Sequence, residues 1–193
     1  MKIAICPGHY TAAKGAVNHT YNINEHDEAI KVVDELSDIL LTKGHEVKII
    51  SGKLSEKISL INSEHFDVAL DIHFNAGGGR GCEVIHTPSS GVRMRQAEEM
   101  SLTISTFLNT KNRGAKDGWY RMDVPGQVDF PGDVDGDEHK DAFTAQTNCP
   151  AFIPEPLFID CDEDAKYWLV GGRHRIIADA IAHGIMSAMK GEV

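Results

Sequence analysis

The chain has 193 residues, 41% of them hydrophobic and 7% aromatic, and its 29 acidic and 19 basic residues give a formal net charge of -10. This size and composition predict a single domain with one buried core. The negative charge and the scattered basic residues argue against binding to nucleic acid or to an anionic membrane surface. Cys6, Cys82, Cys149 and Cys161 lack metal-type spacing, so we expect mostly buried free thiols.

The first half of the chain alternates between short apolar strands and amphipathic helices. Strands are expected at 2–6, 46–50 and 67–74. The first helix should begin after Asn24 as N-cap and end at Lys43-Gly44, a basic last turn followed by glycine. Apolar residues at helical spacing, expected to face inward, are Ile30, Val33, Leu36 and Leu40 in the first helix and Leu54, Ile58 and Ile61 in the second.

The second half continues with a strand at 81–87 and a helix at 89–110, whose inward face should carry Met94, Ala97, Met100 or Ser101, Ile104 and Leu108. An acidic insertion follows at about 122–143, then a strand within 150–158 and a final helix from about Trp168 to Lys190. The order of elements predicts an α/β domain, residues 1–193, with a twisted, largely parallel but mixed sheet and helices on both faces.

The segment 1–9, MKIAICPGH, has too short an apolar run for a secretory signal. No later run approaches the ~18 apolar residues of a membrane span. We therefore expect no signal peptide and no membrane insertion, with synthesis in the cytoplasm.

Two histidines follow strands that should run in the same direction. His9 comes directly after Pro7-Gly8 at the end of the first strand, and His73 lies at the end of the third. A single histidine after a turn is usually solvated or locally hydrogen-bonded. The carboxyl ends of parallel strands meet at one edge of a sheet, where open α/β sheets place ligands, so we expect the two histidines to share a site.

A carboxylate would complete a three-ligand zinc site with these histidines, leaving a fourth position for water. Glu25 is the best candidate, because it lies in the first turn of the first helix, whereas Glu28 is nearly a turn further along and should point elsewhere. The alternative is that Glu25 only complements the positive end of the helix.

Several motifs in chain order together resemble one enzyme family. They are CPGH at 6–9, NEHDEA at 24–29, DIHFNA at 71–76, RGCEV at 80–84, NRGAK at 112–116 and PAFIPEPLFID at 150–160. Each motif alone is weak, but the set resembles, over nearly the whole chain, the zinc-dependent N-acetylmuramoyl-L-alanine amidases of the type-3 amidase group, found in bacterial autolysins and phage endolysins. The resemblance implies zinc ligation by His9, Glu25 and His73, with Glu155 as the catalytic acid/base.

The local sequence agrees with a special role for Glu155. It closes an apolar strand, where a carboxylate is costly to bury unless it faces a cleft or a partner; the alternative is an exposed strand-end residue. Pro154 and Pro156 depart from the family pattern, and because proline cannot donate a ladder hydrogen bond, the strand should end at Glu155 or lie at a sheet edge.

Two further residues, Asn75 and Glu83, have two interpretations each. Asn75 could hold the second ring nitrogen of a ligand or contact substrate, or could be a simple turn residue. Glu83 is either a carboxylate that supports the site or, as we slightly favour, an outward-facing strand residue. His26 is expected to face solvent.

The resemblance implies hydrolysis of the amide between N-acetylmuramic acid and L-alanine in peptidoglycan, for cell lysis or wall remodelling. Alternatives are a zinc peptidase acting on stem peptides and a non-catalytic module that binds the cell wall. A phage or prophage endolysin, released through a membrane lesion, fits best with the missing signal, and a catalytic domain trimmed of its signal and wall-binding modules fits nearly as well. The acidic stretch 129–141, whose glycine spacing does not fit an EF-hand, is expected to overhang the cleft; the oligomeric state has no prediction.

Overall fold

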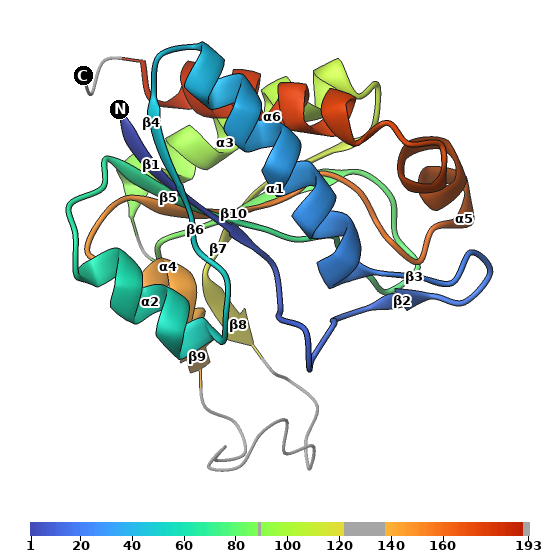
Figure 1. The fold of residues 1–193 in the computed structure, drawn as a ribbon, viewed down its shortest axis with the longest axis horizontal. Helices are drawn as coiled ribbons and strands as arrows, with labels where there is room; N and C mark the ends of the chain where they lie inside the picture. Colours follow the sequence, from blue (N-terminus) through green and yellow to red (C-terminus); the bar gives the residue numbers. More distant parts are fainter. Residues whose placement is uncertain (89, 122–137, 191–193) are drawn as a thin grey trace.

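The computed structural model describes residues 1–88, 90–121 and 138–190. Within these ranges, the main sheet has six strands in the order β4-β1-β5-β10-β6-β7 (Figure 1). Their bounds are β1 Lys2–Pro7, β4 Glu46–Ile49, β5 Val68–Ile72, β6 Cys82–His86, β7 Asn112–Asp117 and β10 Ala151–Glu155. Two short ribbons pair β2 (Val17–Asn18) with β3 (Ile23–Asn24) and β8 (Trp119–Arg121) with β9 (Glu138–Lys140).

Helices cover both faces of the sheet, as predicted. On one face lie α1 (Glu25–Thr42), α3 (Gly91–Phe107) and α6 (His174–Ala188), and on the other lie α2 (Leu54–Asn62) and α4 (Ala142–Gln146) (Figure 1). A short helix α5 (Asp162–Asp164) continues into a π-helical turn, η1 (Ala165–Val170). In the described ranges no helix combines the length and the apolar character needed to cross a bilayer.

The strand directions confirm a largely parallel, mixed sheet. Strands β4, β1, β5 and β10 run parallel to one another, whereas β6 is antiparallel to β10. Strand β7 pairs with β6 in the parallel direction. Strands β1, β4 and β5 are parallel because the connections through α1 and α2 are crossovers. Strand β10, from late in the chain, lies between β5 and β6, which are consecutive in sequence.

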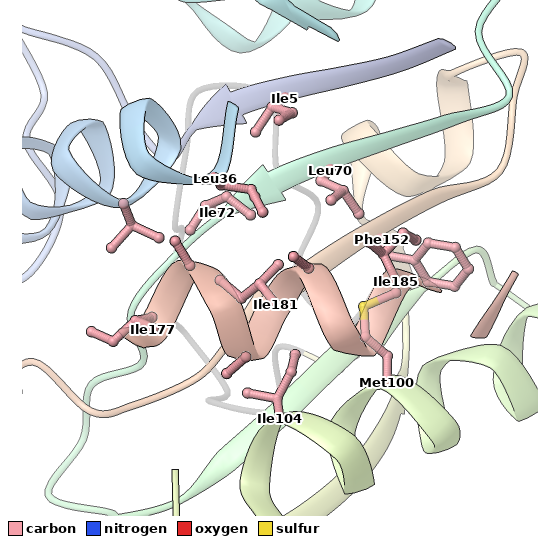
Figure 2. Packing of buried hydrophobic residues seen from close by; sticks show 14 of the residues in the cluster. Ile5, Leu36, Leu70, Ile72, Met100, Ile104, Phe152, Ile177, Ile181 and Ile185 are labelled. Atoms are coloured by element: carbon pink, nitrogen blue, oxygen red, sulfur yellow. The ribbon is translucent and has the colours of Figure 1, made fainter. Parts of the chain in front are cut away.

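Alternation along the strands divides the core between the two faces. In β1, Ile3 and Ile5 face the larger cluster under α1, α3 and α6, whereas Ala4 and Cys6 face the smaller cluster under α2 and α4. Figure 2 shows the larger cluster, in which Ile181 of α6 lies among side chains from the sheet, α1 and α3. The four cysteines are free, with Cys6 and Cys82 buried and the other two partly exposed.

The predicted bounds of α1 are confirmed. The Asn24 side chain accepts a 3.0 Å hydrogen bond from the backbone N–H of Asp27, which satisfies one of the unpaired donors in the first turn. At the other end Lys43 is the C-cap, and Gly44 adopts φ +83°, the left-handed conformation that favours glycine.

Other predictions about the helices are wrong. The expected helix 168–190 is two elements, because the pair Gly171-Gly172 interrupts it and Gly172 has φ +68°; α6 begins only at His174. Ile30, Met94 and Leu54, expected to face inward, are 38%, 42% and 42% exposed.

Candidate active site

Three segments that are distant in sequence bring two histidines and one glutamate together at the carboxyl ends of β1 and β5. His9 follows β1, Glu25 is the first residue of α1, and His73 follows β5. Each offers one donor atom, and these atoms lie within 4.8 Å of one another. The parallel arrangement of β1 and β5 therefore produces the juxtaposition that the sequence predicts.

The carboxylate of Glu25 lies between the two imidazole rings. Its Oε2 is 3.0 Å from His9 Nε2, and its Oε1 is 2.8 Å from His73 Nδ1. The backbone N–H groups of Ala16 and Phe74 also donate to it, each at 3.1 Å. Burial alone would raise the pKa of Glu25, but the hydrogen bonds and charges of His73 and His9 outweigh burial and hold this pKa well below its usual range.

The chemistry of this donor set fits zinc. Two imidazole nitrogens and one carboxylate are the protein ligands of many catalytic zinc sites, which keep a fourth position for water or substrate. Gly15 packs directly against the cluster with φ +74°, and a Cβ at this position would lie 2.5 Å from Glu25 Oε2 and contact the His9 ring. The backbone at Gly15 thus approaches the side chains of His9 and Glu25 as closely as a glycine allows.

His26 fixes the turn that carries His9. Its side chain is only 4% exposed, and its Nδ1 lies 2.7 Å from the carbonyl oxygen of Gly8. The backbone N–H of Gly8 donates to Ile72 O at 2.8 Å, which joins the ends of β1 and β5. The expectation that His26 faces solvent is wrong, because the first turn of α1 packs directly on the Pro7-Gly8 turn.

Glu155 lies beside the same cluster, in a pocket of about 250 Å³ that His9 and His73 also line. Burial disfavours its charged form and outweighs the opposing charge of His73, and with a further contribution from Glu83 and Glu25 it raises the pKa of Glu155 to about 7. A carboxyl group with a pKa near neutrality can both take and return a proton at physiological pH.

Strand β10 ends at Glu155 as expected, but in the interior of the sheet and not at an edge. Its ladder with β5 covers Ala151 and Phe152 only, so no bond to β5 requires the N–H that Pro154 lacks. The Pro154 carbonyl instead accepts a 3.2 Å hydrogen bond from the backbone N–H of His73. The ends of these two strands are therefore joined next to the cluster.

Glu83 does not face outward. It is 8% exposed and lies opposite Glu155 in the antiparallel ladder of β10 and β6. Arg113 Nε donates to it at 2.6 Å and Asn75 Nδ2 at 2.7 Å. The Asn75 side chain thus supports Glu83 and makes no recorded contact with a ring nitrogen of either histidine among the described residues.

Sequence reasoning missed two charged residues beside the site, Lys57 and Asp71, which also line the pocket. Two signals could have found them. Lys57 occupies the apolar stripe of its helix between Leu54 and Ile61, and Asp71 is two residues before His73 on the same face of β5.

The apolar wall of the pocket comes from Tyr10, Leu54, Phe143 and Ile153, and Asp141 lies at its rim as the N-cap of α4. Asp141 and Phe143 belong to the expected acidic insertion, so part of this insertion does border the cleft. Residues 122–137 of the insertion lie outside the described residues.

A mixed α/β sheet with a donor cluster at its strand ends that could hold a metal ion, and a carboxylate in the adjoining pocket, is an arrangement typical of hydrolases. The model of the family Amidase_3, N-acetylmuramoyl-L-alanine amidase, matches residues 3–187. The chain belongs to this family and is an enzyme that hydrolyses the bacterial cell wall, as its motifs predict.

Several solved structures share the fold. The catalytic domain of the CD27L endolysin targeting Clostridium difficile is 24% identical with a TM-score of 0.75, over 96% of this chain and 97% of that one. AmiC2 of Nostoc punctiforme, an N-acetylmuramoyl-L-alanine amidase, is 19% identical with a TM-score of 0.77, over 98% and 97%. Cwp6 from Clostridium difficile is 23% identical with a TM-score of 0.79, over 98% of this chain and 29% of that one. A comparison with curated proteins finds no match.

Proposed function

We propose that the chain cleaves the amide between the lactyl group of N-acetylmuramic acid and L-alanine with a zinc ion held by His9, Glu25 and His73. One observation carries the assignment: the Glu25 carboxylate lies between two imidazole rings, 3.0 and 2.8 Å from their nitrogens, next to a pocket that also contains Glu155. Zinc would polarise the scissile carbonyl and lower the pKa of a bound water toward ~7.

Glu155 would act as the general base and then as the general acid. It would accept a proton from the attacking water and deliver it to the departing amine of L-alanine, which cannot leave as an anion. The pKa of Glu155, raised by burial to about 7, supports this double role. Glu83, Arg113 and Asn75 would maintain the electrostatic surroundings of Glu155 through the ladder of β6 and β10.

The same four side chains could in principle serve a peptidase that cuts within the stem peptide. The family match over residues 3–187 favours the amidase. A non-catalytic module that binds the wall would have no use for a carboxyl group with a pKa near neutrality, and it predicts that Glu155→Gln changes nothing.

The test combines metal analysis with product analysis. We expect about one zinc per chain in the purified protein, and mass spectrometry of digested peptidoglycan should show stem peptides that begin with a free L-alanine amine. Glu155→Gln should lower the rate about 100- to 10,000-fold while zinc content stays the same. Cleavage between two stem-peptide residues would assign the peptidase, and bound zinc without cleavage by the wild type would assign the binding module.

We also propose that the chain acts on the wall as an endolysin, and its similarity to the CD27L catalytic domain supports this setting. Expression in a bacterium with susceptible peptidoglycan should then leave cells intact until a membrane-permeabilising protein is co-expressed, when lysis should follow. Lysis without that second protein would indicate another route to the wall.

A further inference from the structure

Lys57 is buried to an extent that is unusual for a lysine. It is 1% exposed, although it belongs to a nine-residue helix, α2, on the surface of the sheet. A buried ammonium group is costly unless it is paired and hydrogen-bonded. Its Nζ donates to Asp71 Oδ1 at 3.0 Å and to the carbonyl oxygen of Pro7 at 2.5 Å.

These two contacts join the strands that carry the two histidines. Pro7 is the last residue of β1, two positions before His9, and Asp71 lies in β5, two positions before His73. Since residues two apart on a strand share a face, Asp71 and His73 point to the same side of the sheet. Lys57 therefore holds the ends of β1 and β5 together directly below the donor cluster.

Asp71 also faces the ring of His73 on the side away from Glu25. Asp71 Oδ2 lies 3.4 Å from His73 Nε2, whereas His73 Nδ1 faces Glu25 at 2.8 Å. Metal-binding histidines commonly donate their second ring N–H to a carboxylate, which fixes the tautomer and the ring orientation. The side chain of Asp71 is itself held in place by Lys57.

We propose that Lys57 and Asp71 are positioning residues of the metal site: Lys57 orients Asp71, and Asp71 holds His73 with Nε2 protonated and Nδ1 directed at the metal. This inference rests on the zinc site of the proposed function and deepens it. A buried ion pair with a purely structural role would need no contact with a histidine ring or with the strand end that precedes His9.

The test is a zinc titration of three variants in competition with a chromophoric chelator, with zinc alone as the ligand. Asp71→Asn, which keeps the shape of the side chain, should weaken zinc binding about 10- to 100-fold, the usual effect of removing such a partner. Lys57→Met should also weaken it. The double variant should bind zinc about as weakly as Asp71→Asn alone, because Lys57 acts largely through Asp71; fully additive effects would contradict this link.

Glu28→Gln is the matched control. Glu28 is another buried carboxylate, 2% exposed and paired with His174 at 2.6 Å, but it makes no recorded contact with the three proposed ligands. It should lower stability and leave zinc affinity unchanged. If Asp71→Asn behaves in the same way, with affinity within twofold of the wild type, the pair is structural and the inference is wrong.

A measurement on the unmodified protein does not depend on whether a variant folds. Long-range ¹H–¹⁵N spectra of the histidine-labelled, zinc-loaded protein should show His73 with a protonated Nε2 and a metal-bound Nδ1; the opposite tautomer would overturn the proposal. Wild-type protein that binds no zinc would contradict the proposed function itself. Zinc binding that Glu25→Gln abolishes and Asp71→Asn leaves intact would contradict only this inference.

Discussion

Glu83 and Glu155 lie opposite each other on neighbouring antiparallel strands, with Glu83 buried and Glu155 half-buried at the pocket. Arg113 and Asn75 hydrogen-bond Glu83, whereas no such partner is recorded for Glu155 among the described residues. Burial raises the pKa of Glu155 to about 7, and the neighbouring Glu83 adds to this effect. Glu155 is therefore a group that can exchange a proton near neutrality.

The first prediction concerns the pH dependence of catalysis. Burial, with a contribution from Glu83, raises the pKa of Glu155 to about 7, and the base must be ionised, so kcat/KM should fall as pH decreases through this region. Glu83→Gln removes a repulsive charge and should move this limb of the profile to lower pH. Glu98→Gln, at an exposed position on α3, should leave the profile unchanged. A limb that stays in place in Glu83→Gln would contradict the coupling of the two carboxylates.

The second prediction compares two glutamates on one helix. Glu25→Gln should abolish stoichiometric zinc binding, measured by atomic emission after dialysis, and hydrolysis should be lost with the metal. Glu28→Gln, less than one turn away, should retain both, since Glu28 contacts Lys31 and His174 instead. Equal zinc content in the two variants would exclude Glu25 as a ligand. Chelator treatment of the wild type should likewise remove activity, and added zinc should restore it.

The third prediction uses two glycines with similar backbone conformations. Gly15→Ala should weaken zinc binding because its Cβ would press on Glu25 and the His9 ring, in addition to the strain at φ +74°. Gly44→Ala has comparable strain at φ +83° but open space around the new methyl group. Both variants should lose about 1–2 kcal/mol of stability in denaturant titrations. Only Gly15→Ala should alter zinc affinity. If Gly15→Ala and Gly44→Ala changed zinc affinity equally, the effect would come from backbone strain and not from contact of the new methyl group with Glu25 and His9.

The fourth prediction concerns acid stability. Burial alone would raise the pKa of Glu28, but its hydrogen bonds with His174 and Lys31 outweigh burial and lower the pKa below 4.5. A carboxyl group with a lowered pKa in the folded state stabilises the fold above its unfolded pKa, and this contribution disappears as pH falls through the folded value. Glu28→Gln should therefore cost about 1–3 kcal/mol near pH 7. The difference from the wild type should shrink below pH 4.5, and a constant difference down to pH 3 would contradict this origin.

The sequence is informative where local patterns determine structure. Strand alternation, the Asn24 cap and the crossover order together predict that His9, Glu25 and His73 converge, because the direction of β1 and β5 follows from their connections. The position of β10 does not follow from any local pattern. Its insertion between β5 and β6 is a long-range pairing, and it is this pairing that turns Glu83 toward Glu155.

The partners of buried charges also do not follow from the sequence. The position of Lys57 in an apolar helical stripe favours burial, but the sequence does not show which groups would pair with its charge. Only the three-dimensional arrangement provides the Asp71 carboxylate and the Pro7 carbonyl that make its burial possible.

His9 has φ +58°, a left-handed conformation that is unfavourable for a residue with a side chain, and the structure around it imposes this conformation. The bond between His26 and Gly8 O fixes the preceding turn, and Glu25 fixes the ring. Contacts between the sheet end and α1 therefore set the orientation of His9. For the zinc site that we propose, the consequence is preorganisation: binding should require little rearrangement of this side chain.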